Sequence, residues 1–183
     1  MDVRDQLVQA GVELLEAKGL ASLTQRQIAT RVGVSHGAPR HYFPTYANLL
    51  AAIARVGVEE LDATIRAGLA IPDARSALSS VAENVVNFAI DRPAMFELIA
   101  RHDLLEGAGG NLREITSSWL ELLTTRIRDI RADADERHGL ALWAGVQGLG
   151  TMLGRRSTDV ISTQKVNPKP VLAVLIDGIT QTS

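Results

Sequence analysis

The chain of 183 residues contains no cysteine, which excludes a disulfide framework, a thiolate metal site and a cysteine nucleophile. It also lacks any uninterrupted apolar run of the roughly 18 residues that span a bilayer. The segment Met1–Gln6 carries charge in place of the apolar stretch of a signal peptide. We therefore expect a cytoplasmic protein without membrane contact, whose 46% of hydrophobic residues can build a globular core.

Acidic residues are absent from one long window of the sequence. No Asp or Glu occurs between Lys18 and Val58, so residues 17–58 carry a formal charge of +5, against −3 for residues 1–16 and −4 for residues 59–183. Lys and Arg displace the counterions that a DNA duplex binds, so a local cationic face can bind DNA even on a protein of net charge −2. The charge pattern therefore keeps nucleic acid among the expected partners.

Apolar residues recur three and four positions apart almost everywhere, and no long alternation indicates a strand. This period predicts an all-α fold. Besides two short helices inside the acid-free window, the expected helices cover residues 2–18, 45–70, 73–91, 93–105, 111–131, 134–154 and 168–180. Asn111, and either Asp133 or Asp135, are the expected N-caps of two of them. Residues 155–167 are polar and aperiodic, which indicates a loop.

The acid-free window contains the pattern of two short helices joined by a tight turn. Thr24 and Gln27 form a capping box at the start of the first helix. Gly33 can adopt the positive φ of a turn, and Ser35 is expected to cap a second helix that extends to about Tyr42. We expect this second helix to read DNA, because a helix fits the major groove, where arginine pairs with guanine.

The expected DNA contacts come from both short helices and from the start of the helix that follows. The N-terminal end of the first helix favours a phosphate, and the second helix offers side chains to base edges. The candidate DNA-binding residues are Thr24, Gln25, Arg26, Ser35, His36, Gly37, Ala38, Arg40, His41, Tyr42 and Tyr46.

Residues 4–50 resemble the N-terminal domain of the TetR (tetracycline-repressor-like) family of transcriptional regulators. The matching residues are Ala10, Leu14, Gly19, Thr24, Ile28, Ala29, Val32, Gly33, Val34, Ser35, Gly37, Tyr42, Phe43, Leu49 and Leu50. The resemblance implies about nine helices, with a helix-turn-helix DNA-binding domain over residues 1–50 and a ligand-binding and dimerisation domain over residues 51–183. It also implies a homodimer whose reading helices face successive major grooves of a double-stranded DNA operator, and a small-molecule inducer.

Three residues depart from the family pattern. Arg40 stands where the family usually has tyrosine, Tyr46 stands where it has lysine, and Pro39 is unusual in a reading helix. Our hypotheses are that Arg40 reads a base edge or holds a phosphate, and that the Tyr46 hydroxyl donates to a phosphate. The same departures keep an alternative open: a helical ligand-binding or interaction protein whose DNA-binding domain is degenerate.

In the C-terminal region, large apolar side chains occur together with a few polar groups, as in small-molecule pockets. The candidate ligand-binding residues are Asn84, Phe88, Met95, Phe96, His102, Trp119, Leu123, Trp143 and Gln147. Most of them fit equally well in a closed core, which would be typical of a regulator that has no ligand or is controlled by a protein partner.

Residues 134–154 and 168–180 are apolar on more than one face and must be covered on both sides. Burial within one subunit would satisfy this requirement, but we favour the four-helix dimer interface that the family resemblance implies. The candidate dimer-interface residues are Gly145, Gly148, Met152, Val171, Val174 and Leu175.

Metal and catalytic sites are not indicated. The four histidines show no ligand spacing with carboxylates, the serines lack a nucleophile-elbow context, and residues 107–110 lack the Lys-Ser/Thr ending of a phosphate loop. We expect no metal, no cofactor and no enzymatic activity. Together with the family resemblance, the sequence predicts a homodimeric transcriptional repressor of a palindromic operator, released by a small hydrophobic or amphipathic inducer.

Overall fold

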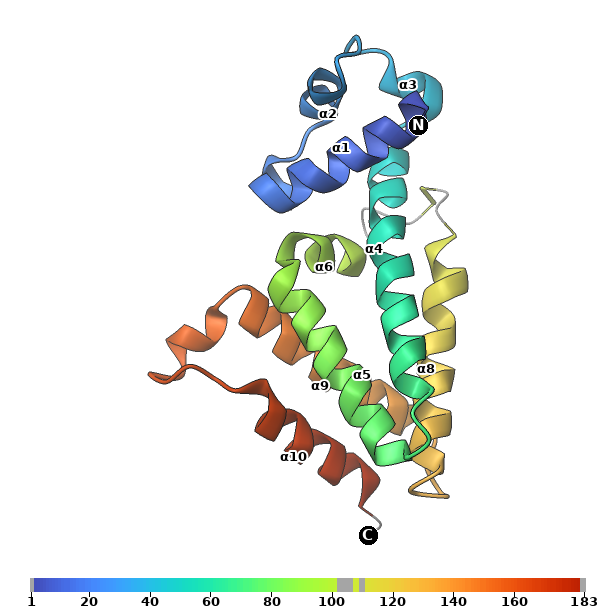
Figure 1. The fold of residues 1–183 in the computed structure, drawn as a ribbon, viewed down its shortest axis with the longest axis vertical. Coiled ribbons are helices and arrows are strands. Elements are labelled where there is room, and N and C mark those ends of the chain that lie inside the picture. Colours follow the sequence, from blue (N-terminus) through green and yellow to red (C-terminus); the bar gives the residue numbers. More distant parts are fainter. Residues whose placement is uncertain (1, 102–106, 109–110, 182–183) are drawn as a thin grey trace. The chain divides into compact units, whose positions relative to one another are not determined.

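The computed structural model describes residues 2–101, 107–108 and 111–181. Over these residues the chain forms nine α-helices, two 3₁₀ helices and no strand, which confirms the predicted all-α fold. The helices are α1 (Val3–Lys18), η1 (Leu20–Ser22), α2 (Gln25–Val32), α3 (Pro39–Tyr42), α4 (Tyr46–Leu69), α5 (Ala74–Asp91), α6 (Pro93–Ala100), α8 (Leu112–Arg128), α9 (Glu136–Gly154), η2 (Ser157–Val160) and α10 (Pro168–Thr180) (Figure 1).

The chain divides into two compact units, and one boundary falls inside α4, between Val58 and Glu59. The first unit comprises Met1–Val58 and Ala94–Leu112, and the second comprises Glu59–Pro93 and Arg113–Ser183. The first unit therefore holds the helices of the acid-free window, and the second holds most of the helices that follow α4.

In the first unit, α1 packs against α2 and α3. Leu7 of α1, Ile28 of α2 and Ile53 of α4 have no exposed surface and form the centre of its core. Gly11 lets α1 approach α4 closely, because a Cβ atom at this position would overlap the Ile53 side chain. Close packing of this kind holds α1 as the support on which α2 and the following turn rest.

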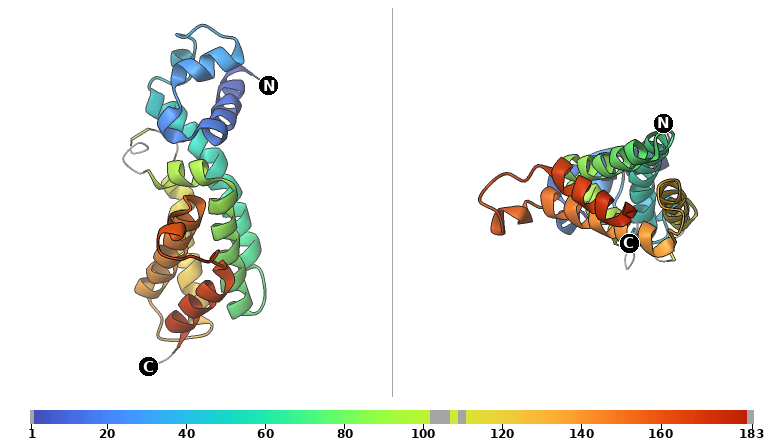
Figure 2. Two further views of the ribbon diagram at one scale, coloured as in Figure 1. Left: turned by 90° about the vertical axis from the view of Figure 1, so that its left-hand side faces the viewer. Right: turned by 90° about the horizontal axis from the view of Figure 1, so that it is seen from below.

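In the second unit, α5 and α9 pack along each other and α10 contacts both (Figure 2). Leu78 and Val85 of α5 are fully buried, and Leu142 of α9 is almost so. A Cβ atom at Gly145 of α9 would overlap Leu175 of α10, so these two helices cross in direct contact. Gly145 and Leu175, both candidate dimer-interface residues, therefore contact each other within one subunit.

Polar side chains connect α4 to α8 inside the second unit. The Arg126 guanidinium donates hydrogen bonds to the carbonyl oxygens of Leu69, at 2.6 Å, and Ile71, at 3.0 Å. Leu69 is the last residue of α4, where helical geometry leaves acceptors without partners, and Ile71 follows two residues later. Arg126 thus closes the C-terminal end of α4 from a neighbouring helix.

The helix boundaries confirm one predicted cap. Asp135 is the N-cap of α9, and its carboxylate accepts a hydrogen bond from the backbone N–H of Arg137 at 3.0 Å. Asn111 directly precedes α8, as predicted, and has a φ of 47°. The expected loop at residues 155–167 contains the short helix η2 and is otherwise irregular.

Within residues 2–101, 107–108 and 111–181, no helix is long and apolar enough to cross a membrane. Nor do the described side chains include a cluster of three His, Cys, Asp or Glu residues that could hold a metal ion.

Candidate nucleic-acid interface

The first short helix begins as predicted. The Thr24 hydroxyl oxygen accepts a hydrogen bond from the backbone N–H of Gln27 at 3.3 Å, and the Gln27 side-chain oxygen accepts one from the backbone N–H of Thr24 at 3.0 Å. This reciprocal capping box fixes the start of α2. Thr24 and Arg26 are exposed and Gln25 is half-buried, so the first turn is open to an anion that binds at a helix N-terminus.

The turn after α2 also has the predicted geometry. Gly33 adopts the left-handed conformation, with φ 80° and ψ 25°, which a residue with a Cβ atom rarely adopts. The backbone N–H of Val34 then donates to the carbonyl oxygen of Ala29 at 3.1 Å. The chain is therefore sent sharply away from α2 toward the second short helix.

The second short helix is shorter than predicted, and the expected role of Ser35 as its cap is wrong. α3 comprises only Pro39–Tyr42, its N-cap is Ala38, and no side chain caps it. Residues 36–38 form turns, in which the backbone N–H of Ala38 donates to the carbonyl oxygen of Ser35 at 3.0 Å. Pro39 has no N–H to donate four residues back to Ser35, so an α-helix starts at the proline, where the missing donor costs little.

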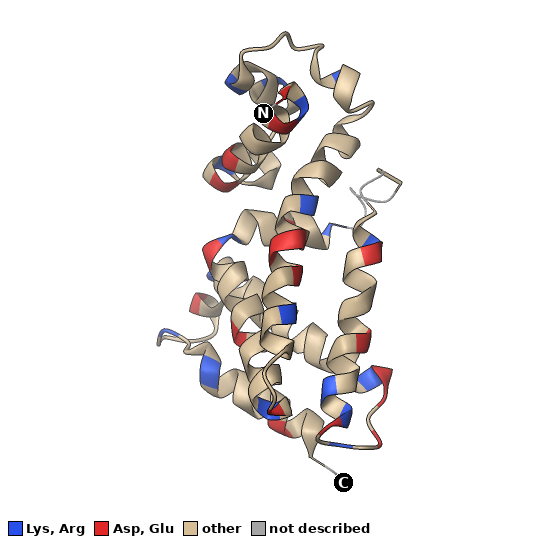
Figure 3. Ribbon diagram, turned by 45° about the vertical axis from the view of Figure 1, so that its right-hand side comes forward, with Lys and Arg blue, Asp and Glu red and all other residues tan. Residues whose placement is uncertain are grey.

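The residues expected to read DNA are nevertheless at the surface. Ser35, His36, Gly37, Arg40 and His41 are exposed, as is Tyr42 at 42%, while Ala38 is half-buried. From η1 to the middle of α4 the ribbon in Figure 3 carries Arg but no Asp or Glu. Arg26 and Arg40 have no carboxylate partner among the described residues. This surface therefore offers cationic groups to an external anion.

The structure gives Tyr46 a different role from the predicted phosphate contact. Its hydroxyl donates a hydrogen bond to the carbonyl oxygen of Leu23 at 2.7 Å, which uses its only proton. Burial raises the pKa of the Tyr46 phenol to about 12, so the hydroxyl stays neutral at physiological pH. Tyr46 thus ties the start of α4 to the residue before the α2 cap, and the N-terminal ends of these two helices lie next to each other.

Sequence reasoning missed two features of this surface. The Arg4 guanidinium lies over the Phe43 ring, 5.2 Å from its centroid, and so brings a further cation beside α3. Thr45 and Asn48 form a second capping box, at the start of α4, with hydrogen bonds of 2.9 and 3.2 Å. The Thr45–Asn48 spacing repeats that of Thr24 and Gln27 and would have revealed this cap. Arg4 lies outside the acid-free window, and only the fold brings it there.

The candidate ligand-binding residues are divided between the two units. In the second unit, the Trp119 and Trp143 rings lie 5.3 Å apart between centroids at an angle of 50°, and the Trp119 indole N–H donates to Asp62 at 2.8 Å. Phe88 and Leu123 are buried in the same unit, and Asn84 and Gln147 are half-buried.

Two further candidates for the ligand site belong to the first unit. Met95 and Phe96 lie on α6, where Met95 packs against Gly57 of α4. His102 lies outside the described residues. Within the second unit, the structure groups the two tryptophans with a carboxylate.

The candidate dimer-interface residues other than Gly145 and Leu175 are accessible. Val174 is 74% exposed, Val171 and Gly148 are also exposed, and Met152 is half-buried. Leu140, which the sequence did not single out, is 55% exposed on α9. α9 and α10 thus carry an uncovered apolar surface.

Known proteins match both the DNA-binding segment and the whole fold. The model of the family described as bacterial regulatory proteins, tetR family, matches residues 7–53. A nucleoid occlusion factor SlmA from Marinomonas sp. (strain MWYL1) is 27% identical over 176 residues, which cover 93% of this chain and 89% of that protein.

Two solved structures show the same fold. A TetR-like transcriptional regulator from Rhodococcus sp. RHA1 has a TM-score of 0.73 and 14% identity, over 97% of this chain and 93% of its own. BioQ, solved with its natural double-stranded DNA operator, has a TM-score of 0.68 and 19% identity, over 98% of this chain and 99% of its own. The matched helix-turn-helix segment and the shared fold lead to one conclusion: the chain belongs to the TetR family of bacterial regulatory proteins, which are not enzymes, and is a DNA-binding transcriptional regulator.

Proposed function

We propose that the protein is a homodimeric repressor, which binds a palindromic double-stranded DNA operator and is released by a small hydrophobic or amphipathic inducer. The observation that carries the proposal is the exposed, acid-free helix-turn-helix surface. In this proposal residues 1–50 bind DNA, and residues 51–183 bind the inducer and form the dimer. The operator complex of BioQ, which shares the fold, supports duplex DNA as the partner.

The DNA contacts divide into two groups by chemistry. The adjacent N-terminal ends of α2 and α4 present backbone N–H groups, and with Arg26 they hold the phosphate backbone. Arg40 and His41 of α3 face base edges, where arginine pairs with two acceptors of guanine. Because α3 has only four residues, the turn residues 36–38 lie close enough to add contacts of their own.

The dimer is argued from the apolar surface on α9 and α10. Leu140, Val171 and Val174 are large apolar side chains that a monomer leaves in water. Burial of apolar surface contributes about 25 cal/mol per Å², and two copies of these helices would cover each other's exposed faces. A two-fold dimer also presents two α3 helices, which is what a palindromic operator requires.

The inducer is assigned to the second unit, beside Trp119 and Trp143. Their rings supply a large apolar surface, and Asp62 supplies a charged group at 2.8 Å from the Trp119 indole nitrogen. An inducer lowers DNA affinity only if it binds the DNA-incompetent conformer more tightly than the competent one. Because both tryptophans of the chain lie in this unit, quenching of their fluorescence reports inducer binding directly.

Transcription in vitro tests the proposal. The template carries a promoter overlapped by the duplex that the protein selects from random DNA, and the expected result is a fall in transcript as the protein is added. A compound that quenches the tryptophans should restore the transcript. If the protein binds no duplex but still binds such compounds, the alternative of a ligand-binding protein with a degenerate DNA-binding domain holds instead.

A further inference from the structure

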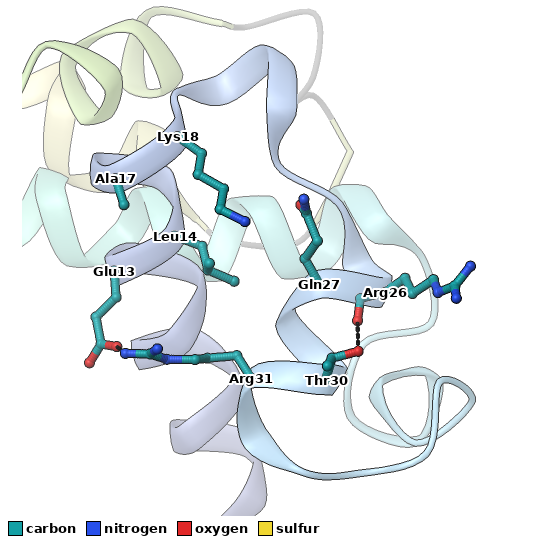
Figure 4. A pocket seen from close by; sticks show the side chains of 8 residues that line it. All are labelled: Glu13, Leu14, Ala17, Lys18, Arg26, Gln27, Thr30 and Arg31. Atoms are coloured by element: carbon teal, nitrogen blue, oxygen red, sulfur yellow. Dashed lines mark hydrogen bonds and ion pairs between the residues drawn. The ribbon is translucent and has the colours of Figure 1, made fainter.

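A pocket of about 480 Å³ lies between α1 and α2, inside the first unit, and none of the candidate ligand-binding residues lines it (Figure 4). Its volume falls in the range of roughly 300–1,000 Å³ that is typical of small-molecule sites. Leu14 and Ala17 of α1 give it apolar surface, and Gln27 of α2 faces them across the gap. The pocket therefore has the size and the mixed lining of a ligand site.

In the space between the two helices, one cation has no counter-ion. Arg31 reaches from α2 to Glu13 of α1 and forms an ion pair at 3.0 Å, so these two charges neutralise each other. Arg26 also lines the pocket and has no carboxylate partner among the described residues, but its guanidinium is directed outward, away from the space between the helices, in Figure 4. The Lys18 ammonium lies between the helices, and no carboxylate pairs with it among the described residues. The space between the helices thus carries one net positive charge.

The hydrogen-bonding groups nearby favour an acceptor. The Gln27 side-chain oxygen already accepts from the backbone N–H of Thr24, so the Gln27 amide group offers its N–H donors. The Lys18 ammonium offers only donors. A single carboxylate matches this set in charge and in hydrogen bonding, whereas a doubly charged phosphate would require a second free cation directed into the pocket, and the Arg26 guanidinium is directed outward.

We propose that this pocket binds a small molecule that has an apolar tail and a single carboxylate. The tail lies on Leu14 and Ala17, and the carboxylate accepts hydrogen bonds from the Lys18 ammonium and the Gln27 amide. Because Gln27 also closes the capping box at Thr24, the bound carboxylate lies about one helical turn from the N-terminal end of α2. The site is thus placed to act on the DNA-binding surface independently of the second unit.

Octanoate is the probe, and the three lysines make the readout specific. Full-length protein is labelled with ¹³C-lysine, which gives side-chain signals for Lys18, Lys165 and Lys169 alone. On titration with octanoate, the Lys18 signal should shift to saturation while the signals of Lys165 and Lys169 stay in place. Octan-1-ol, which has the same tail without a charge, should bind more weakly.

Two matched variants separate a direct contact with the Lys18 ammonium from the effect of the protein's net charge on anion binding. Lys18→Met keeps an apolar stem and removes the ammonium, so the dissociation constant, read from the backbone amide signals of Ala17 and Gln27, should rise about three- to fivefold. Lys165→Met removes the same charge in the other unit and should leave this constant unchanged.

The proposal is overturned if the Lys18 signal stays in place or moves without saturation. It is equally overturned if octan-1-ol binds as tightly as octanoate, or if Lys18→Met and Lys165→Met bind alike. Binding in the second unit is read separately from the fluorescence of Trp119 and Trp143, so failure of the inducer site and failure of this pocket are distinguishable.

Discussion

Replacing Tyr46 with phenylalanine removes one hydroxyl, which the structure directs toward protein instead of DNA. In the wild-type protein this hydroxyl donates to the carbonyl oxygen of Leu23 at 2.7 Å, and Leu23 itself is buried. The variant keeps the ring but leaves the Leu23 carbonyl without this donor. We therefore expect a loss of stability without a loss of DNA affinity.

The magnitude follows from one hydrogen bond at a half-buried position. The bond contributes about 1 kcal/mol, because its protein partners would otherwise bond to water. For a chain of this length, that change lowers the melting temperature by about 2–4 °C. The DNA dissociation constant and the dependence of its logarithm on salt should be unchanged, whereas loss of a phosphate contact would reduce the salt slope by about 1.

The pH dependence gives the same prediction an independent test. The pKa of Tyr46 is raised to about 12 in the folded protein, from about 10 when unfolded, so the folded state holds this proton more tightly. The contribution of the neutral Tyr46 hydroxyl to the free energy of unfolding is complete below pH 10 and is lost as pH rises toward 12. The free energy of unfolding of the wild type should therefore fall toward that of Tyr46→Phe across this interval.

Circular dichroism melts and fluorescence anisotropy with operator DNA measure the two effects on the same samples. The reasoning is refuted if Tyr46→Phe melts like wild type while binding DNA more weakly and with a smaller salt slope. That result would restore the phosphate contact predicted from the sequence.

Three further substitutions address the other parts of the account. Arg40→Ala should raise the operator dissociation constant about tenfold in gel-shift titrations, through loss of a base or phosphate contact; unchanged affinity and salt slope would remove Arg40 from the interface. Val174→Glu places a charge on the proposed dimer surface and should make the free energy of dimerisation, measured by sedimentation, less favourable by at least about 2 kcal/mol; a wild type that sediments as a monomer would contradict the proposed dimer. Arg126→Met leaves the carbonyls of Leu69 and Ile71 without their donor and should lower the melting temperature by about 4–8 °C; an unchanged melt would contradict the role of Arg126 at the end of α4.

Most helices could be predicted from the sequence because their signals are local. Apolar spacing marks the buried stripe of each helix, and caps such as Thr24 and Asp135 mark where a helix starts. The left-handed Gly33 was predicted for the same reason, since a tight turn requires a residue that adopts positive φ. These features depend on residues within about one turn of one another.

The errors arose where a distant contact or a backbone constraint decided the outcome. Ser35 has the chemistry of a cap, but Pro39 lacks the N–H that a helix begun at Ser35 would use. The Tyr46 hydroxyl could have faced solvent, yet it bonds to Leu23, which is 23 residues earlier in the chain. Gly145 was predicted to permit the close approach of another helix, and within the chain that helix is α10. Periodicity shows that a face is buried but not which element covers it.

Selection of duplexes from a random DNA pool tests the central claim, that residues of α2 and α3 form a sequence-specific reader of DNA. Full-length protein retains bound duplexes over successive rounds, and the retained pool is sequenced. The account predicts enrichment of one palindrome whose half-sites lie about one helical turn apart, with the preference relaxed at one position in each half-site for Arg40→Ala. A retained pool that is no more enriched than the starting pool would contradict it.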